Sequence, residues 1–105
     1  MAFYLVRARL KPERRDELLA ALERKEFVSL EPFGRALSMG LTQARIDRDG
    51  RAAWEEEDYC QPPLAQEREA VLDDYFEQIE VEIVEQDAAW RELEDLPRLF
   101  PELKS

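Results

Sequence analysis

The chain has 105 residues, a length that suits a single domain. It carries 25 Asp and Glu against 15 Lys and Arg, which gives a formal net charge of −10. This acidity argues against a nucleic-acid partner and against an anionic membrane surface, because proteins bind both through clustered Lys and Arg. Hydrophobic residues make up 45% of the chain and charged residues 38%, which is typical of a globular domain.

The first residues lack the basic segment and the long apolar stretch of a signal peptide. No apolar run approaches the roughly 20 residues that a membrane span requires. The single cysteine, Cys60, has no second cysteine with which to form an internal disulfide. We therefore expect a cytoplasmic protein.

The charge is divided unevenly along the chain. Residues 1–52 carry 11 Lys and Arg and 8 Asp and Glu, a net +3, whereas residues 53–105 carry 4 and 17, a net −13. Neither half is large enough to make a comfortable domain by itself. We expect the two halves to fold against each other, with opposite charges facing.

Alternating side chains predict a first strand over residues 3–10. One face of this strand is apolar throughout, and the other begins apolar and ends with Arg7 and Arg9. Pro12 predicts the start of a helix, because proline suits the first helical position.

Residues 36–46 predict a second strand. Asp49-Gly50 predicts a type I′ hairpin turn, which requires positive φ at both central positions. A third strand would run from Arg51 into the acidic residues 55–58, with a register that its pattern leaves open. Pro62-Pro63 would end that strand and begin a second helix.

Residues 78–85 alternate apolar and acidic side chains and predict a strand with one buried and one polar face. Asp87 can cap a short last helix that Pro97 ends. Leu99, Phe100 and Leu103 follow, and a tail this apolar must dock on its own domain or on a partner subunit.

The predicted order is β-α-β-β-α-β with an added C-terminal helix, an α+β chain with the ferredoxin-like sheet order 4-1-3-2 and antiparallel neighbours. Residues 1–86 would form this domain, and residues 87–105 the helix and apolar tail. Arg7 and Arg9 would then stand beside Glu80 and Glu82 on one neighbouring strand. On the other side they would meet acids of the 55–58 run.

This element order resembles the dimeric α/β-barrel superfamily, in which two ferredoxin-like subunits press their open sheet faces together. Members include cofactor-independent monooxygenases, muconolactone isomerases and chlorite dismutases. The resemblance implies a homodimer and covers most of the chain, but it rests on element order and transfers no catalytic residue. The chain has no histidine, which argues against the haem-binding and histidine-dependent members.

The acidic run provides the candidate catalytic residues Glu56, Asp58 and Tyr59. On a strand, Glu56, Asp58 and Cys60 would share one face. Two carboxylates on one face can hold a divalent cation or divide the roles of acid and base. The favoured interpretation is a solvated strand end paired with arginines, with Cys60 structural or incidental.

Arg7 and Arg9 are the candidate ligand-binding residues, because guanidinium groups match the carboxylate of a small organic acid. Charge pairing within the chain explains the same residues more simply. We expect no metal and no cofactor. The leading hypothesis is a homodimeric accessory or interaction protein; the alternative is a cofactor-independent enzyme or binding protein for a small organic acid.

Overall fold

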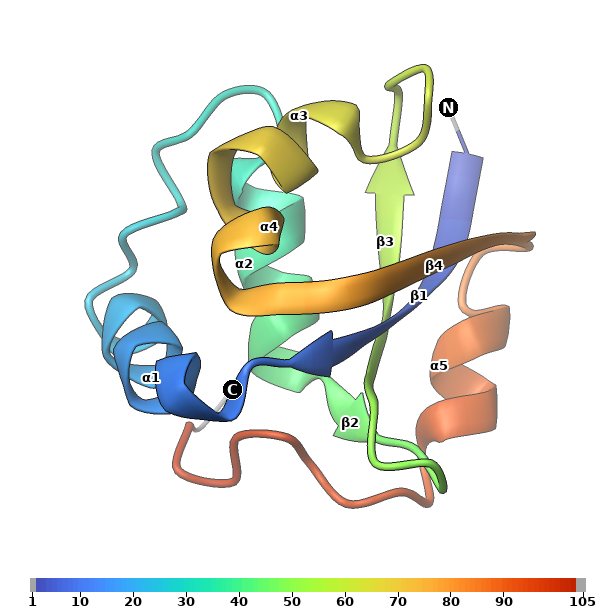
Figure 1. The fold of residues 1–105 in the computed structure, drawn as a ribbon. Helices are drawn as coiled ribbons and strands as arrows, with labels where there is room; N and C mark the ends of the chain where they lie inside the picture. The colour runs from blue at the N-terminus through green and yellow to red at the C-terminus, as the bar shows by residue number, and fades with distance from the viewer. Residues whose placement is uncertain (1, 104–105) are drawn as a thin grey trace.

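A computed structural model of the chain describes residues 2–103 and shows one four-stranded antiparallel sheet (Figure 1). The strands stand in the order β2-β3-β1-β4, which gives the same neighbours as 4-1-3-2 read from the opposite edge. Strands β1 and β3 are therefore central, and β2 and β4 form the edges. Their bounds are β1 Ala2–Leu10, β2 Arg45–Ile46, β3 Ala52–Asp58 and β4 Phe76–Val84.

Most of the helical structure covers one face of the sheet, and a short last helix lies on the other (Figure 1). No helix within residues 2–103 is both long and apolar enough to cross a membrane. The helical segments are η1 Pro12–Arg14 (a 3-10 turn), α1 Arg15–Glu23, α2 Gly34–Gln43, α3 Ala65–Glu67, η2 Arg68–Leu72 (a π turn), α4 Asp73–Tyr75 and α5 Ala88–Leu93.

The strand predicted over residues 36–46 is wrong for most of its length. That segment lies largely in helix α2, and only the two residues of β2 pair with β3. The reason is that Leu37 and Leu41, both fully buried, stand one helical turn apart. Ala, Leu and Met also favour helix over strand.

The hairpin between β2 and β3 is confirmed, but its turn differs from the predicted one. Within the loop, Gly50 has a φ of 81°, whereas Asp49 is not among the described residues with positive φ. A type I′ turn requires positive φ at both positions, so the connection belongs to a longer loop class. The Gly50 N–H donates to the Asp47 carbonyl, and the Asp47 N–H donates to the Arg51 carbonyl.

The register of β3 against β1 settles where the acidic run lies. Val6 stands opposite Trp54 and Arg7 opposite Ala53, so the acids of residues 55–58 face residues 2–5. The prediction that these acids meet Arg7 and Arg9 is therefore wrong. On the other side of β1, Arg7 does stand opposite Glu80 in β4, as expected.

The core lies between the sheet and helices α1 to α4. Its largest fully buried side chains include Trp54, whose ring centroid is 5.4 Å from that of Phe76. The apolar tail docks into this core on its own chain: Leu99, Phe100 and Leu103 are buried, and the Leu99 N–H donates to the Ala44 carbonyl. The domain boundary at residue 86 stays a prediction.

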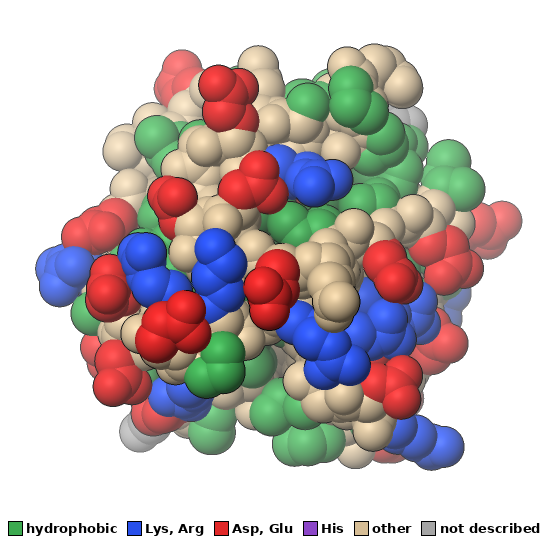
Figure 2. All heavy atoms as spheres, viewed as in Figure 1, with side chains coloured by type: hydrophobic (Ala, Val, Ile, Leu, Met, Phe, Trp, Pro, Cys, Tyr) green, Lys and Arg blue, Asp and Glu red, His purple; other side chains and the backbone are tan. Residues whose placement is uncertain are grey.

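Ion pairs join the basic first half of the chain to the acidic second half. Arg7 contacts Glu82 at 3.4 Å, and Arg51 contacts Glu80 at 3.2 Å. Arg15, at the start of α1, contacts Glu102 in the tail at 3.0 Å. Figure 2 shows basic and acidic side chains interspersed on the face that it displays. The expected facing of opposite charges is confirmed for these pairs.

We expect the substitution Gly40→Ala to destabilise the fold by about 1–3 kcal/mol, because overpacking a well-filled core forces its neighbours to move. A Cβ at Gly40 would lie 2.7 Å from Cδ1 of Trp54 and 3.4 Å from the Glu55 carbonyl oxygen. Urea unfolding followed by tryptophan fluorescence measures the change. Ser38→Ala, on the same helix, is the control, and equal stability of the two variants would contradict the predicted clash.

Candidate functional site

The acidic run of β3 is divided between the two faces of the sheet. Glu56 and Asp58 share the face of Trp54, which packs into the core, and Glu55 lies on the face of α5. All three are buried, with exposed fractions of 6% for Glu55, 2% for Glu56 and 5% for Asp58. The interpretation of this run as a solvated strand end is therefore wrong.

Glu55 supplies the N-terminal cap of α5. One carboxylate oxygen accepts the Asp87 N–H at 2.9 Å, and the other accepts the Ala89 N–H at 3.0 Å. Asp87 itself has a φ of 68° and makes no capping hydrogen bond through its side chain. The predicted Asp87 cap is therefore replaced by a carboxylate from the sheet, which the positive end of the helix favours.

A second buried acid lies beside Glu56. The Trp54 indole N–H donates to Oε1 of Glu56 at 3.0 Å, whereas Oε2 has no hydrogen-bond partner among the described residues. Glu67, from α3, is fully buried at 0% exposed, and its Oε2 also lacks such a partner. Its Oε1 accepts a weak hydrogen bond from the Cys60 thiol, with a sulfur–oxygen distance of 3.8 Å.

Asp58 organises the loop that leads from β3 to α3. Its Oδ2 accepts the Leu64 N–H at 2.6 Å and the Cys60 N–H at 3.1 Å. Leu64 has a φ of 63°, an unusual conformation for a leucine, at the point where this loop enters the helix. The result is a compact group of Glu56, Asp58, Cys60 and Glu67, here termed the acid–thiol cluster.

The acids of the acid–thiol cluster titrate differently because their surroundings differ. Burial and the adjacent carboxyl of Glu67 raise the pKa of Glu56 well above its ordinary value. Burial also raises the pKa of Glu67. For Asp58, burial favours the neutral form, but Glu67 and the backbone N–H groups of the loop outweigh it and lower the pKa. Asp58 is therefore the carboxylate that holds negative charge most readily.

Cys60 has a raised thiol pKa. The Gln66 backbone lowers it, but burial and the negative charges of Asp58 and Glu67 together outweigh that effect. A raised thiol pKa opposes thiolate formation and hence nucleophilic chemistry.

A surface pocket of about 530 Å³ opens beside the acid–thiol cluster. Asp58 and Cys60 line it, together with Tyr59, whose side chain is largely exposed. Arg35 of α2 brings a basic group to the same wall. Of the three candidate catalytic residues, Asp58 and Tyr59 line this pocket, whereas Glu56 is buried and does not line it.

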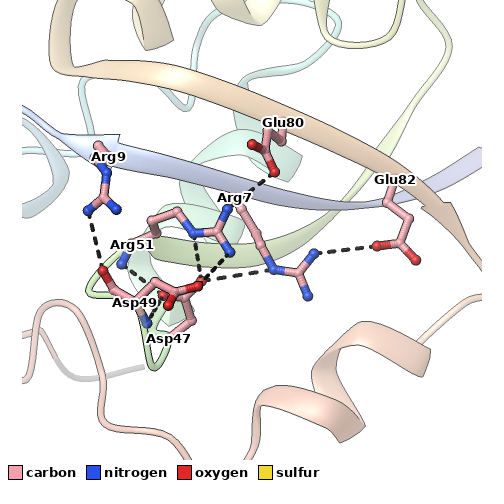
Figure 3. Close-up of polar contacts among 7 residues, drawn as sticks. All are labelled: Arg7, Arg9, Asp47, Asp49, Arg51, Glu80 and Glu82. Carbon is pink, nitrogen blue, oxygen red and sulfur yellow. Dashed lines mark hydrogen bonds and ion pairs between the residues drawn. The ribbon is translucent and has the colours of Figure 1, made fainter.

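The candidate ligand-binding arginines lie on the opposite face of the sheet. Figure 3 shows Arg7 between Asp47, at 3.9 Å, and Glu82, at 3.4 Å. The Arg9 guanidinium donates to the Asp49 carbonyl at 3.3 Å. A hollow of about 350 Å³ adjoins Arg7 on this face. The sheet therefore separates these arginines from Glu56 and Asp58, and the two sets cannot share one pocket.

Sequence reasoning missed Glu67, the residue that completes the acid–thiol cluster. A signal for it exists: Leu64, Glu67 and Val71 follow helical spacing, so Glu67 stands in the apolar stripe of its helix. An acid at an apolar position indicates a buried partner.

Comparison with known proteins returns no match to any family model, curated protein or solved structure. The resemblance to the dimeric α/β-barrel superfamily therefore stays a prediction.

We expect Glu55→Ala to destabilise the protein by about 1–3 kcal/mol, because the buried N–H groups of α5 lose their acceptors. Chemical unfolding followed by circular dichroism measures the loss. Glu57→Ala, on the same strand, is the control because Glu57 is more exposed. Equal stability of the two variants would contradict the capping role.

We expect the free energy of unfolding to fall as the pH rises above about 4.5, the ordinary value for Glu56. The folded state holds the Glu56 proton more tightly than the unfolded state, so this stabilisation is lost as the pH rises through the raised folded pKa. Glu56→Gln cannot titrate and should show a smaller fall. Urea unfolding between pH 4 and pH 9 measures both curves.

Glu85→Gln, which changes an exposed acid, is the control for that series. Its pH dependence should follow the wild type. If Glu56→Gln loses stability with pH as steeply as the wild type, the raised pKa of Glu56 is wrong.

Proposed function

We propose that this protein is a small homodimeric accessory protein that works by self-association through strand β4. The observation that carries the proposal is the exposure of Ile83, whose side chain is 71% exposed near the end of this strand. Ile83 stands opposite Tyr4, a core residue, so it lies on the sheet face that the helices cover elsewhere. A second copy would bury this apolar surface.

The outer edge of β4 is open to a partner. Strand β4 ends the sheet, and within residues 2–103 it pairs only with β1. Ile79 and Val81 are half-buried on the same side as Ile83, so the apolar row that the sequence predicted is only partly covered. A strand with a free edge and an incompletely covered apolar row is suited to pairing with another strand.

The acids of β4 would ordinarily prevent two such edges from pairing. Here Glu80 is ion-paired with Arg51 and Glu82 with Arg7, which offsets much of their repulsion. Antiparallel pairing of two copies about Val81 would place Ile79 opposite the partner's Ile83. Glu80 would then face the partner's Glu82, each beside its own arginine.

Association through the edge fits this chain better than association through the open sheet face. The dimeric α/β-barrel arrangement requires that face to be free, but α5 already buries Leu5 and Ala53 on it. We propose a ferredoxin-like sheet in which α2 precedes a shortened β2, with an edge-to-edge dimer in place of a barrel.

The alternative function, an enzyme or binding protein for a small organic acid, has less support. Its arginines, Arg7 and Arg9, are engaged in contacts within the chain. Its acids, Glu56 and Asp58, lie on the other face of the sheet. The pocket beside Asp58 contains Arg35, but Glu57 and Asp58 give it more acidic than basic side chains.

We expect the wild-type protein to sediment as a dimer at micromolar concentration and Ile83→Lys to sediment as a monomer. Lysine at this position places a charge in the proposed apolar contact, and we expect the dimer Kd to rise at least about tenfold, or 1.4 kcal/mol. Analytical ultracentrifugation over a concentration series measures both proteins.

Val28→Lys is the matched control, because Val28 is a partly exposed apolar residue in the loop between α1 and α2. It should stay dimeric. A wild type that is monomeric at these concentrations would overturn the proposed function. A dimer that survives Ile83→Lys but not Val28→Lys would place the interface elsewhere.

A further inference from the structure

The acid–thiol cluster contains three side chains, two carboxylates and one thiol, that are suited to a divalent metal ion. One ligand atom from each of Asp58, Cys60 and Glu67 lies within 4.8 Å of the other two. We propose that these three side chains bind a divalent transition-metal ion, of which Zn²⁺ is the representative, at the end of β3. This site does not depend on association through β4.

A cluster of acids is not by itself a site, but two buried oxygens here lack partners outside the cluster. Among the described residues, Oε2 of Glu56 and Oε2 of Glu67 have no hydrogen-bond donor outside the cluster, although both side chains are almost completely buried. A buried polar atom without a partner costs about 1–3 kcal/mol. An ion at the centre of the cluster would compensate that cost.

The ligand set selects the class of metal. Thiolate together with carboxylate suits Zn²⁺ and related ions, whereas Mg²⁺ and Ca²⁺ prefer oxygen ligands alone. Zn–S and Zn–O bonds of about 2.3 and 2.1 Å place tetrahedral ligand atoms about 3.4–3.7 Å apart. Side-chain closure by about 1 Å would therefore complete the site. The absence of histidine is no obstacle, since zinc sites accept Cys, Asp and Glu.

The surroundings of the cluster also fit a cation. No ion pair among residues 2–103 involves Glu56, Asp58 or Glu67, so no basic side chain neutralises them directly. The backbone N–H groups of Cys60 and Leu64 bind Oδ2 of Asp58 and hold its carboxylate in place beside the other two ligands. The adjoining pocket, lined by Asp58 and Cys60, gives a path from solvent.

The first test is calorimetric titration of the chelator-treated protein with Zn²⁺. We expect one ion per chain in the wild type, and an affinity at least about tenfold lower in Cys60→Ser and in Glu67→Gln. Glu69→Gln, which changes an exposed acid on the same helical run, is the control and should bind like the wild type. Circular dichroism of each variant shows whether it is folded.

The second test uses Co²⁺ as a probe of the sulfur ligand. Wild-type protein with Co²⁺ should show a thiolate-to-metal charge-transfer band in the near ultraviolet. Folded Cys60→Ser should lack this band, and Glu69→Gln should keep it. No zinc binding by the wild type, or equal affinity in all four proteins, would overturn the proposed site. A band that persists in Cys60→Ser would overturn Cys60 as a ligand.

Discussion

Strand β3 is buried on both faces although it carries a run of acids, and this constraint organises much of the molecule. A carboxylate taken out of water is costly unless it finds donors or keeps its proton. Glu55 binds the N-terminus of α5, and Asp58 binds the backbone of the loop that leads to α3. Glu56 takes the Trp54 indole N–H and lies beside Glu67. The helices on both sides of the sheet are thus tied to the acids of one strand.

The sheet separates two electrostatic environments. On the α5 face, Arg7 and Arg51 neutralise the acids of the hairpin and of β4 in a partly solvated network. On the helical face, acids of β3 and α3 gather without basic partners in direct contact. On the α5 face, the arginines and acids neutralise one another, so these arginines need no bound organic acid. On the helical face, buried carboxylate oxygens have no basic partner, and a metal ion would supply the missing positive charge.

Self-association and metal binding would use different parts of the fold and different physical interactions. Association through β4 depends on apolar surface and a free strand edge, which the arginines make available by holding Glu80 and Glu82. Metal binding depends on the C-terminal end of β3, where Asp58 and Cys60 lie close to Glu67. Because the first concerns the edge strand and the second a central strand, each can fail while the other stands.

Local pattern alone was enough to predict β1, β3, β4, the hairpin and the last helix, because alternation, Gly50 and proline act over a few residues. Local pattern failed over residues 36–46, although Leu37 and Leu41 fit helical spacing. The close approach of Gly40 to the Trp54 side chain, which appears in the tertiary structure, shows that this helix packs on the sheet. Of the site, the sequence indicated Glu56, Asp58 and Tyr59 but assigned Glu56 and Asp58 to solvent. Their burial was decided by the register of β3 and by Glu67, because strand register and contacts between distant residues are set only when the chain closes on itself.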